Sequence, residues 1–331
     1  MRAAVVSEPG GPEVLRVEER PTPEARPGWV LVRVRGFGLN RSELGTRRGD
    51  SGDAVRFPRV LGIECVGEVA EAPGSDLEPG RTVVAAMGGM GREFDGGYAE
   101  CALLPREHVI PISTTLPWSR LAALPETFAT AWGSVVKTLR LERGETILVR
   151  GGSSSVGMAA ITIASELGAT VIATTRQEAK RAAMEEQGAD HVVIDPGSIA
   201  EEVRRIAPDG VDALFELVGP RVIADSVAAV RSGGRVCLSG YLAESWDVDS
   251  ARAAVAAAGA SFATFGSIEV SDDAYREPLQ AIVEAVESGR YRDGLARVFE
   301  LDEIADAHRL MEDDGVAGKV VVLTGADGPA G

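Results

Sequence analysis

The segment at 147–174 constrains the fold more than any other part of this sequence. Its letters ILVRGGSSSVG at 147–157 describe an apolar strand, a turn of small residues and the start of a helix, and a second apolar strand follows at 170–174. This order is that of a dinucleotide-binding βαβ unit. Small residues let a pyrophosphate approach the backbone, and a helix N-terminus offers it free N–H groups and a partial positive charge. The segment therefore predicts a nucleotide-binding α/β sheet.

The alternation of strand and helix continues to about residue 240. Helical patterns occur at 177–187, 198–206 and 221–230, and apolar strands occur at 191–194, 211–218 and 234–239. Ser198 and Glu201 have the spacing of a capping box, so we expect a helix to begin there. Such alternation predicts a doubly wound parallel sheet with helices on both faces.

The two ends of the chain have a different pattern. Before residue 120, short strands at 2–6, 29–36, 64–70 and 82–86 are separated by turns rich in Gly and Pro, which is typical of a mostly antiparallel β domain. Amphipathic helices at 277–287 and 302–311 and a strand at 319–323 follow the alternating region. A length of 331 residues suits two domains. We expect 1–119 and 261–331 to form the β domain, with the nucleotide domain at 120–260 inserted between them.

Charge, hydropathy and cysteine usage exclude several classes of partner. The formal net charge of −16 disfavours DNA, RNA and anionic membrane surfaces. No apolar run approaches the ~20 residues that cross a bilayer, and the short apolar run at 2–6 is unlike a signal peptide. The three cysteines lie far apart, which favours a reducing compartment over a disulfide framework. We therefore expect a cytoplasmic location and no membrane partner.

Short motifs occur in a consistent order along nearly the whole chain. They are EPGGPEVL at 8–15, GLN at 38–40, PRVLGIE at 58–64, DGGYAE at 95–100, TAW at 130–132, GADH at 188–191, AHR at 307–309 and GKVV at 318–321. Together they resemble the medium-chain dehydrogenase/reductase superfamily, and within it the zinc-free quinone oxidoreductase group. The resemblance implies a Rossmann domain inserted in a GroES-like domain.

The resemblance also bears on metal binding. In zinc alcohol dehydrogenases of the same superfamily, a cysteine ligand stands at the position of Asn40 and a histidine ligand at that of Ile63. An amide and an aliphatic side chain cannot replace a thiolate and an imidazole, and Glu64 alone is not a metal site. The cysteine-rich structural zinc lobe is also absent, because no two cysteines are close in sequence. We expect no metal, and hydride delivery to a quinone or a conjugated C=C rather than alcohol chemistry.

The end of the second strand bears on the choice of cofactor. An NAD-specific site needs an acidic residue there to bind the ribose hydroxyls, but this chain has Thr174, Thr175 and Arg176, and no acid precedes Glu178. Arg176 and Lys180 would bind a 2′-phosphate by charge-assisted hydrogen bonds, or would be solvated surface cations. We predict NADPH. Ser154, where the family usually has glycine, would either crowd the pyrophosphate or hydrogen-bond it.

Candidate site residues follow from the strand ends and from the resemblance. Asn40 would face the nicotinamide or the substrate, or cap a turn; Arg41 would contact a substrate oxygen or a neighbouring carboxylate. Tyr241 would donate a proton or line the pocket. An apolar floor of Phe94, Trp132 and Phe265 would bind the substrate, with core packing as the alternative. The other expected cofactor contacts are Thr130, Gly152, Ser153, Ser155, Val156, Leu217, Val218, Gly219, Gly240, Gly266 and Lys319.

Three functions are compatible with these features. The leading one is an NADPH-dependent reductase of quinones or α,β-unsaturated carbonyls. An enoyl-thioester reductase of a biosynthetic pathway is the second, and an NADPH-binding structural or regulatory protein with little turnover is the third. The apolar, small-residue strand at 260–265 resembles a sheet edge that invites pairing, so we expect a homodimer. The three histidines show no partner pattern, and we expect structural or exposed roles for them.

Overall fold

The computed structural model describes residues 1–240, 242, 247–267 and 270–330, and it divides into two compact units. The β-rich unit consists of Met1–Ala129, Ser267–Gly289 and Leu295–Gly331. The α/β unit consists of Thr130–Gly266 and Arg290–Gly294. The divisions at 129/130 and 266/267 lie ten and six residues beyond the positions 119/120 and 260/261 expected from the sequence, and the short segment Arg290–Gly294 belongs to the α/β unit.

The α/β unit is built on one six-stranded sheet in which every pair of neighbours is parallel. The strand order is β11-β10-β9-β12-β13-β14, which is the order 3-2-1-4-5-6 of a Rossmann sheet. The strands are β9 (Thr146–Arg150), β10 (Thr170–Thr175), β11 (His191–Ile194), β12 (Val211–Glu216), β13 (Val230–Leu238) and β14 (Ser261–Thr264). The predicted doubly wound fold is confirmed.

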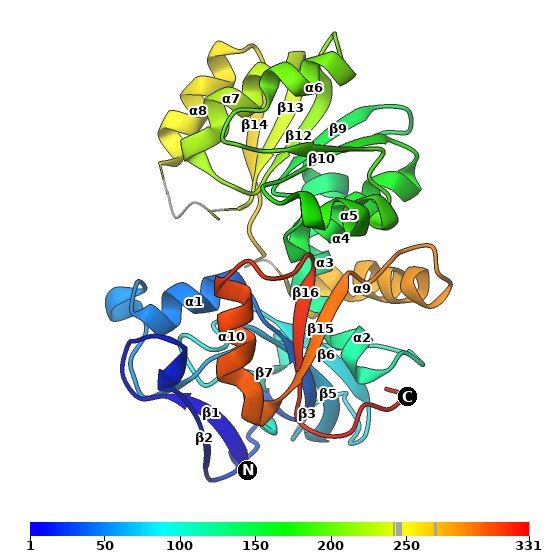
Figure 1. Cartoon of the computed structure of the whole chain (residues 1–331). Coiled ribbons are helices and arrows are strands. Elements are labelled where there is room, and N and C mark those ends of the chain that lie inside the picture. Colours follow the sequence, from blue (N-terminus) through cyan, green and yellow to red (C-terminus); the bar gives the residue numbers. More distant parts are fainter. Residues whose placement is uncertain (241, 243–246, 268–269, 331) are drawn as a thin grey trace. The chain divides into compact units, whose positions relative to one another are not determined.

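Helices follow the strands in turn, as Figure 1 shows. They are α4 (Ser155–Leu167), α5 (Arg181–Gln187), α6 (Ala200–Ile206), α7 (Ile223–Ala228) and α8 (Val248–Ala257). One core cluster joins Leu148 and Leu214 of the sheet to Val203 of α6, Val227 of α7 and Val255 of α8. Burial of these aliphatic side chains is the main stabilising contribution on this face of the sheet.

The capping box predicted at Ser198 is wrong. Helix α6 begins at Ala200, and the Ser198 hydroxyl donates to Asp225 Oδ1 at 2.7 Å. The same Asp225 carboxylate accepts the backbone N–H groups of Ile199 and Ala200, at 2.9 and 3.3 Å. A carboxylate from α7 therefore satisfies the free donors of this helix, and no local spacing in the sequence could reveal it.

The β-rich unit combines a seven-stranded and a three-stranded sheet. Its strands are β1 (Arg2–Val6), β2 (Leu15–Glu19), β3 (Trp29–Gly38), β4 (Arg59–Val60), β5 (Glu64–Glu71), β6 (Thr82–Ala86), β7 (Cys101–Pro105), β8 (Val109–Pro111), β15 (Leu295–Glu300) and β16 (Lys319–Leu323). Every pair is antiparallel except β15 with β16. This unit has the mostly antiparallel character that the sequence predicts.

Strand β16 pairs with β3, so the end of the chain completes the sheet begun by its first third. The backbone N–H of Leu39 donates to the carbonyl of Val320 at 2.9 Å, just where β3 leads into α1 (Arg41–Arg48). The other helices of the unit are α2 (Trp118–Ala122), α9 (Asp272–Glu287) and α10 (Ile304–Glu312), and α3 (Pro125–Trp132) runs from this unit into the other. No described helix is long and apolar enough to span a membrane.

Candidate functional site

The turn between β9 and α4 is shaped by close backbone approach. Gly151 has φ +85°, a conformation that L side chains rarely adopt. A Cβ built on Gly157 would lie 2.6 Å from the carbonyl oxygens of both Gly151 and Gly152. The first turn of α4 therefore packs directly on the turn, and only glycine fits at 157.

Side-chain hydroxyls hold this turn in place. Ser154 Oγ accepts the N–H of Gly157 at 3.1 Å and donates to the carbonyl of Gly151 at 2.8 Å, so Ser154 is the N-cap of α4. Its hydroxyl is directed into the turn itself. Thr174 Oγ1 accepts the N–H of Gly151, and Thr175 Oγ1 donates to Ser153 Oγ at 3.2 Å. The buried threonines at the end of β10 thus brace the turn.

Three backbone N–H groups of the turn have no hydrogen-bond acceptor among the described residues. Within the described part of the chain, the N–H groups of Ser153, Ser155 and Val156 donate to no other residue. They lie at the N-terminal end of the 13-residue helix α4, whose dipole favours an anion. These residues fit a pyrophosphate, and they are among the cofactor contacts expected from the sequence.

The two cations after β10 differ in exposure. Arg176 is exposed, whereas Lys180 is only 5% exposed. The nearest acid, Glu178, is paired with Arg181, whose Nε donates to Glu178 Oε1. Arg176 is therefore the more accessible of the two cations to a bound phosphate.

The loop after β12 is held by a buried carboxylate. Glu216 Oε1 accepts the N–H groups of Val218 and Gly219, at 2.8 and 3.1 Å. Gly240 packs against the same loop, because a Cβ built there would lie 2.1 Å from the carbonyl oxygen of Leu217. The structure brings these expected cofactor contacts together.

The other expected residues of the α/β unit lie on α3, just after β14 or outside the described residues. The half-buried Phe265 ring covers Gly133, where a built Cβ would lie 2.2 Å from the ring. Thr130 and Trp132 are on α3, buried and half-buried respectively, and Gly266 is exposed. Tyr241 lies outside the described residues.

A second polar cluster, the Asn40 cluster, is buried in the β-rich unit and consists of Asn40, Glu64 and Lys319. Asn40 Nδ2 donates to Glu64 Oε1 at 2.8 Å, and Lys319 Nζ donates to Asn40 Oδ1 at 2.7 Å. Lys319 Nζ lies 2.6 Å from Glu64 Oε1, and the two side chains are 1% and 0% exposed. Because lysine only donates and glutamate accepts, the orientation of the Asn40 amide is fixed. Lys319, which the resemblance placed near the cofactor, is thus engaged with Asn40.

A chain of hydrogen bonds, the histidine chain, continues from this cluster through Glu43, Tyr98, His308 and Arg47. The N–H of Asn40 donates to Glu43 Oε2 at 2.7 Å, and the Tyr98 hydroxyl donates to the same oxygen. Arg47 Nη1 donates to His308 Nδ1 at 2.9 Å, so the neutral imidazole carries its proton on Nε2 and donates it to Tyr98 Oη at 3.0 Å.

Burial sets the protonation of this chain. It raises the pKa of Glu43 from 4.5 to about 7, against the opposing hydrogen bonds from Tyr98 and Asn40. Burial also lowers the pKa of His308 to about 3, and the Arg47 guanidinium adds to that effect. The imidazole is therefore neutral at pH 7. Sequence reasoning missed the chain, because nothing in the DGGYAE or AHR motifs shows that Tyr98 and His308 meet.

Two further predicted substrate contacts have partners of their own. Arg41 is exposed, and its Nη1 lies 3.4 Å from the carbonyl oxygen of Met311. Phe94 makes an edge-to-face contact with Trp29, with ring centroids 5.2 Å apart. Phe94 also packs against the core of the β-rich unit, which supports the packing alternative for this residue.

The Asn40 cluster does not fit a zinc ion. Among the described residues, no group of three or more His, Cys, Asp or Glu side chains could hold a metal. Asn40 stands beside an ammonium group, and Ile63 offers no ligand atom. A divalent cation at Glu64 Oε1 would meet Lys319 Nζ, which is already 2.6 Å from that oxygen.

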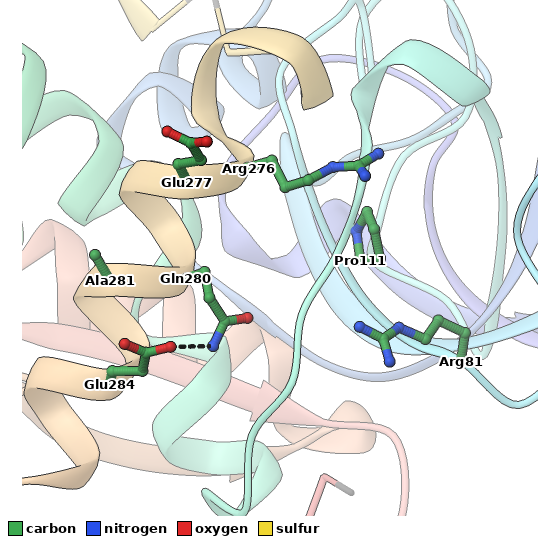
Figure 2. Close-up of a pocket in the computed structure, with 7 residues that line it drawn as sticks. All are labelled: Arg81, Pro111, Arg276, Glu277, Gln280, Ala281 and Glu284. Carbon is green, nitrogen blue, oxygen red and sulfur yellow. Dashed lines mark hydrogen bonds between the residues drawn. The ribbon is translucent and has the colours of Figure 1, made fainter.

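The β-rich unit also has a surface hollow of about 420 Å³, shown in Figure 2. It is lined by Arg81, Pro111, Arg276, Glu277, Gln280, Ala281 and Glu284. Its cations and amide are engaged locally, since Arg81 binds Ser113, Arg276 binds Asp272, and Gln280 binds Ser113 and Glu284. The hollow is therefore a weaker candidate than the turn before α4.

Comparison with known proteins gives matches to both units. Residues 26–114 match the family model described as "Alcohol dehydrogenase GroES-like domain", and residues 155–284 match "Zinc-binding dehydrogenase". Quinone oxidoreductase of Lama guanicoe is 28% identical, over 98% of this chain and 97% of that protein. A phenolphthiocerol/phthiocerol polyketide synthase protein of Mycobacterium tuberculosis is 31% identical, over 97% of this chain. The chain spans only 15% of the length of that synthase protein.

Solved structures agree over the whole length. The crystal structure of an NAD-dependent alcohol dehydrogenase is 31% identical with a TM-score of 0.86, and the match covers 98% of this chain and 100% of that one. The structure of a mycobacterial protein complexed with NADPH is 25% identical with a TM-score of 0.86, covering 98% of this chain and 99% of that one.

Proposed function

This chain belongs to the medium-chain dehydrogenase/reductase superfamily, within it to the zinc-free quinone oxidoreductase group, and from that premise we propose that it is an NADPH-dependent oxidoreductase that reduces quinones or α,β-unsaturated carbonyls. The observation that carries the proposal is the turn before α4, where the N–H groups of Ser153, Ser155 and Val156 form an anion-binding cradle. Bound NADPH would supply a hydride from its nicotinamide ring.

The residues after β10 support NADPH over NADH. The Thr174 and Thr175 hydroxyls are bonded to the turn, and the Glu178 carboxylate is paired with Arg181, so none of the three is placed to select ribose hydroxyls. The exposed guanidinium of Arg176 can bind a 2′-phosphate bidentately. The NADPH complex of the mycobacterial relative is in line with this choice, although another relative is described as NAD-dependent.

The Asn40 cluster supports a reaction without zinc. Lys319 and Glu64 fix the amide of Asn40, whose Nδ2 group donates to Glu64 Oε1 at 2.8 Å and makes a longer contact of 3.5 Å with the carbonyl oxygen of Gly38. The N–H of that longer contact can also bind a substrate oxygen on which charge develops.

Turnover with a substrate panel tests the proposal. The oxidation of NADPH and of NADH is followed by absorbance with quinones, enones and enoyl-thioesters as acceptors. We expect quinones or enones to be reduced, with NADPH preferred. Tight NADPH binding without turnover of any acceptor would favour a structural or regulatory role instead, and binding of neither cofactor would refute the proposal.

An enoyl-thioester reductase is the second candidate. The 31% identity to a segment of a polyketide synthase favours it. The chemistry is the same hydride delivery to a C=C conjugated with a carbonyl, so the two candidates differ only in the acceptor. A preference for enoyl-thioesters over free enones in the same panel would identify this second function.

We further propose a homodimer that pairs through β14 and a cytoplasmic location. Strand β14 is an edge strand of the six-stranded sheet, and an uncovered edge invites pairing. The three cysteines, Cys65, Cys101 and Cys237, are all free, which suits a reducing compartment. Light scattering at micromolar concentration checks the dimer, and cell fractionation checks the location; a monomer or an exported protein would refute the respective proposal.

A further inference from the structure

Arg150 is a fully buried arginine at the carboxyl end of β9, and it is bonded to two aspartates. Its Nε and Nη2 atoms donate to the two oxygens of Asp195, at 2.9 and 3.1 Å. Its Nη1 atom donates to Asp225 Oδ2 and to Ser226 Oγ, both at 2.8 Å. The guanidinium therefore ties the end of β9 to the segment after β11 and to α7.

Ser226 extends the hydrogen bonds of Arg150 to the loop after β12. Its hydroxyl accepts from Arg150 and donates to Glu216 Oε2, while Glu216 Oε1 accepts the N–H groups of Val218 and Gly219. Glu216 and Ser226 are both 0% exposed. We name Arg150, Asp195, Asp225, Ser226 and Glu216 the Arg150 network.

The network decides which polar groups the loop can present to a ligand. The N–H groups of Val218 and Gly219 are occupied by Glu216. The carbonyl of Leu217 accepts from Leu242, and that of Gly219 accepts from Val222. Among the described residues, none donates to the carbonyl of Val218. The loop therefore offers an acceptor, which suits the amino group of a carboxamide.

We propose that Ser226 and Glu216 are positioning residues, which hold the loop after β12 in the conformation that binds the nicotinamide carboxamide. The proposal rests on the NADPH-dependent function proposed above. The hydroxyl of Ser226 connects Arg150 to Glu216. Removing it leaves the ion pairs of Arg150 with Asp195 and Asp225 in place. Without that hydroxyl, Glu216 Oε2 loses the hydrogen bond that Ser226 donates, and only Oε1, through Val218 and Gly219, still orients the carboxylate.

Two ligands separate positioning from general stability. NADPH carries the nicotinamide, whereas 2′-phospho-ADP-ribose keeps the adenosine phosphate and the pyrophosphate but lacks the ring. For Ser226→Ala we expect a loss of about tenfold in NADPH affinity, which matches the contribution typical of one intramolecular hydrogen bond. The affinity for 2′-phospho-ADP-ribose should stay within about twofold, because the turn before α4 is untouched. Calorimetric titration of the full chain measures both.

A matched variant and a second perturbation keep the test decisive. Ser165→Ala removes an exposed hydroxyl from the same unit and should change neither affinity. Glu216→Asp keeps the charge but withdraws the carboxylate by one methylene, and it should reproduce the selective loss should Ser226→Ala fail to fold. Equal losses for both ligands, or no loss, would overturn the inference. Failure of the unaltered chain to bind either ligand would instead overturn the proposed function, and the inference with it.

Discussion

Replacing Lys319 by methionine should destabilise the β-rich unit, because it leaves the Glu64 carboxylate buried without its counterion. The two side chains are 1% and 0% exposed, and Lys319 Nζ lies 2.6 Å from Glu64 Oε1. Breaking such a pair from one side costs about 3–5 kcal/mol. Asn40 Nδ2 and the N–H of Glu126 still donate to Glu64, each at 2.8 Å, so we expect a value near the lower end.

A double-mutant cycle shows whether that loss comes from the ion pair. Glu64→Gln removes the charge, so adding Lys319→Met to it should cost much less than in the unaltered chain. The free energy of unfolding is measured in urea, with hydrogen exchange of peptides from β3 and β16 reporting on this unit. Arg56→Met, at an exposed cation of the same unit, is the matched control and should stay within about 0.5 kcal/mol. An equal loss for Lys319→Met in both backgrounds would refute the reasoning.

Three further predictions concern the turn, the cofactor and pH. Gly157→Ala should cost about 1–3 kcal/mol of unfolding free energy, since its Cβ would lie 2.6 Å from two carbonyl oxygens; unchanged denaturation would contradict this close approach. Arg176→Ala should weaken NADPH by about 1–3 kcal/mol and barely affect NADH; equal losses by calorimetry would show that Arg176 does not bind the 2′-phosphate. Because burial raises the pKa of Glu43 from 4.5 to about 7, the folded state holds a proton that the unfolded state releases, so stability should fall as pH rises across this window and level off above it. Glu43→Gln should remove roughly 3 kcal/mol of that pH dependence. The part that comes from Glu216 should remain, because burial raises the pKa of that carboxyl to about 7 as well. Identical profiles of unfolding free energy against pH for the variant and the unaltered chain would contradict the assignment.

Periodicity located the elements of the α/β unit well, because apolar strands and helices alternate there without long insertions. The strands at 191–194 and 319–323 have the predicted bounds. Strand β15 (Leu295–Glu300) was missed, because its residues show no strict alternation of apolar and polar side chains and none of them is fully buried. The cap of α6 was assigned to Ser198 for a similar reason: local spacing was visible, and a carboxylate 25 residues away was not.

The candidate site residues were predicted with the same limitation to local sequence. Motif resemblance located Asn40 and Lys319, but it did not show that the two side chains meet across 279 residues of sequence. No role was predicted for Arg150 from the sequence, whereas the structure makes it the buried centre of a charged network. Sequence patterns report the period and burial of an element, while hydrogen bonds between distant polar side chains depend on topology.

The pairing of β16 with β3 has a consequence for how this chain forms during synthesis. Residues 1–129 leave the ribosome before residues 295–323, so their sheet lacks β15 and β16 until those residues have been made. The α/β unit, which is continuous from Thr130 to Gly266 apart from Arg290–Gly294, is available for folding earlier. Asn40 therefore lacks its lysine partner until residue 319 has been made, and the α/β unit is the first of the two that the nascent chain can complete.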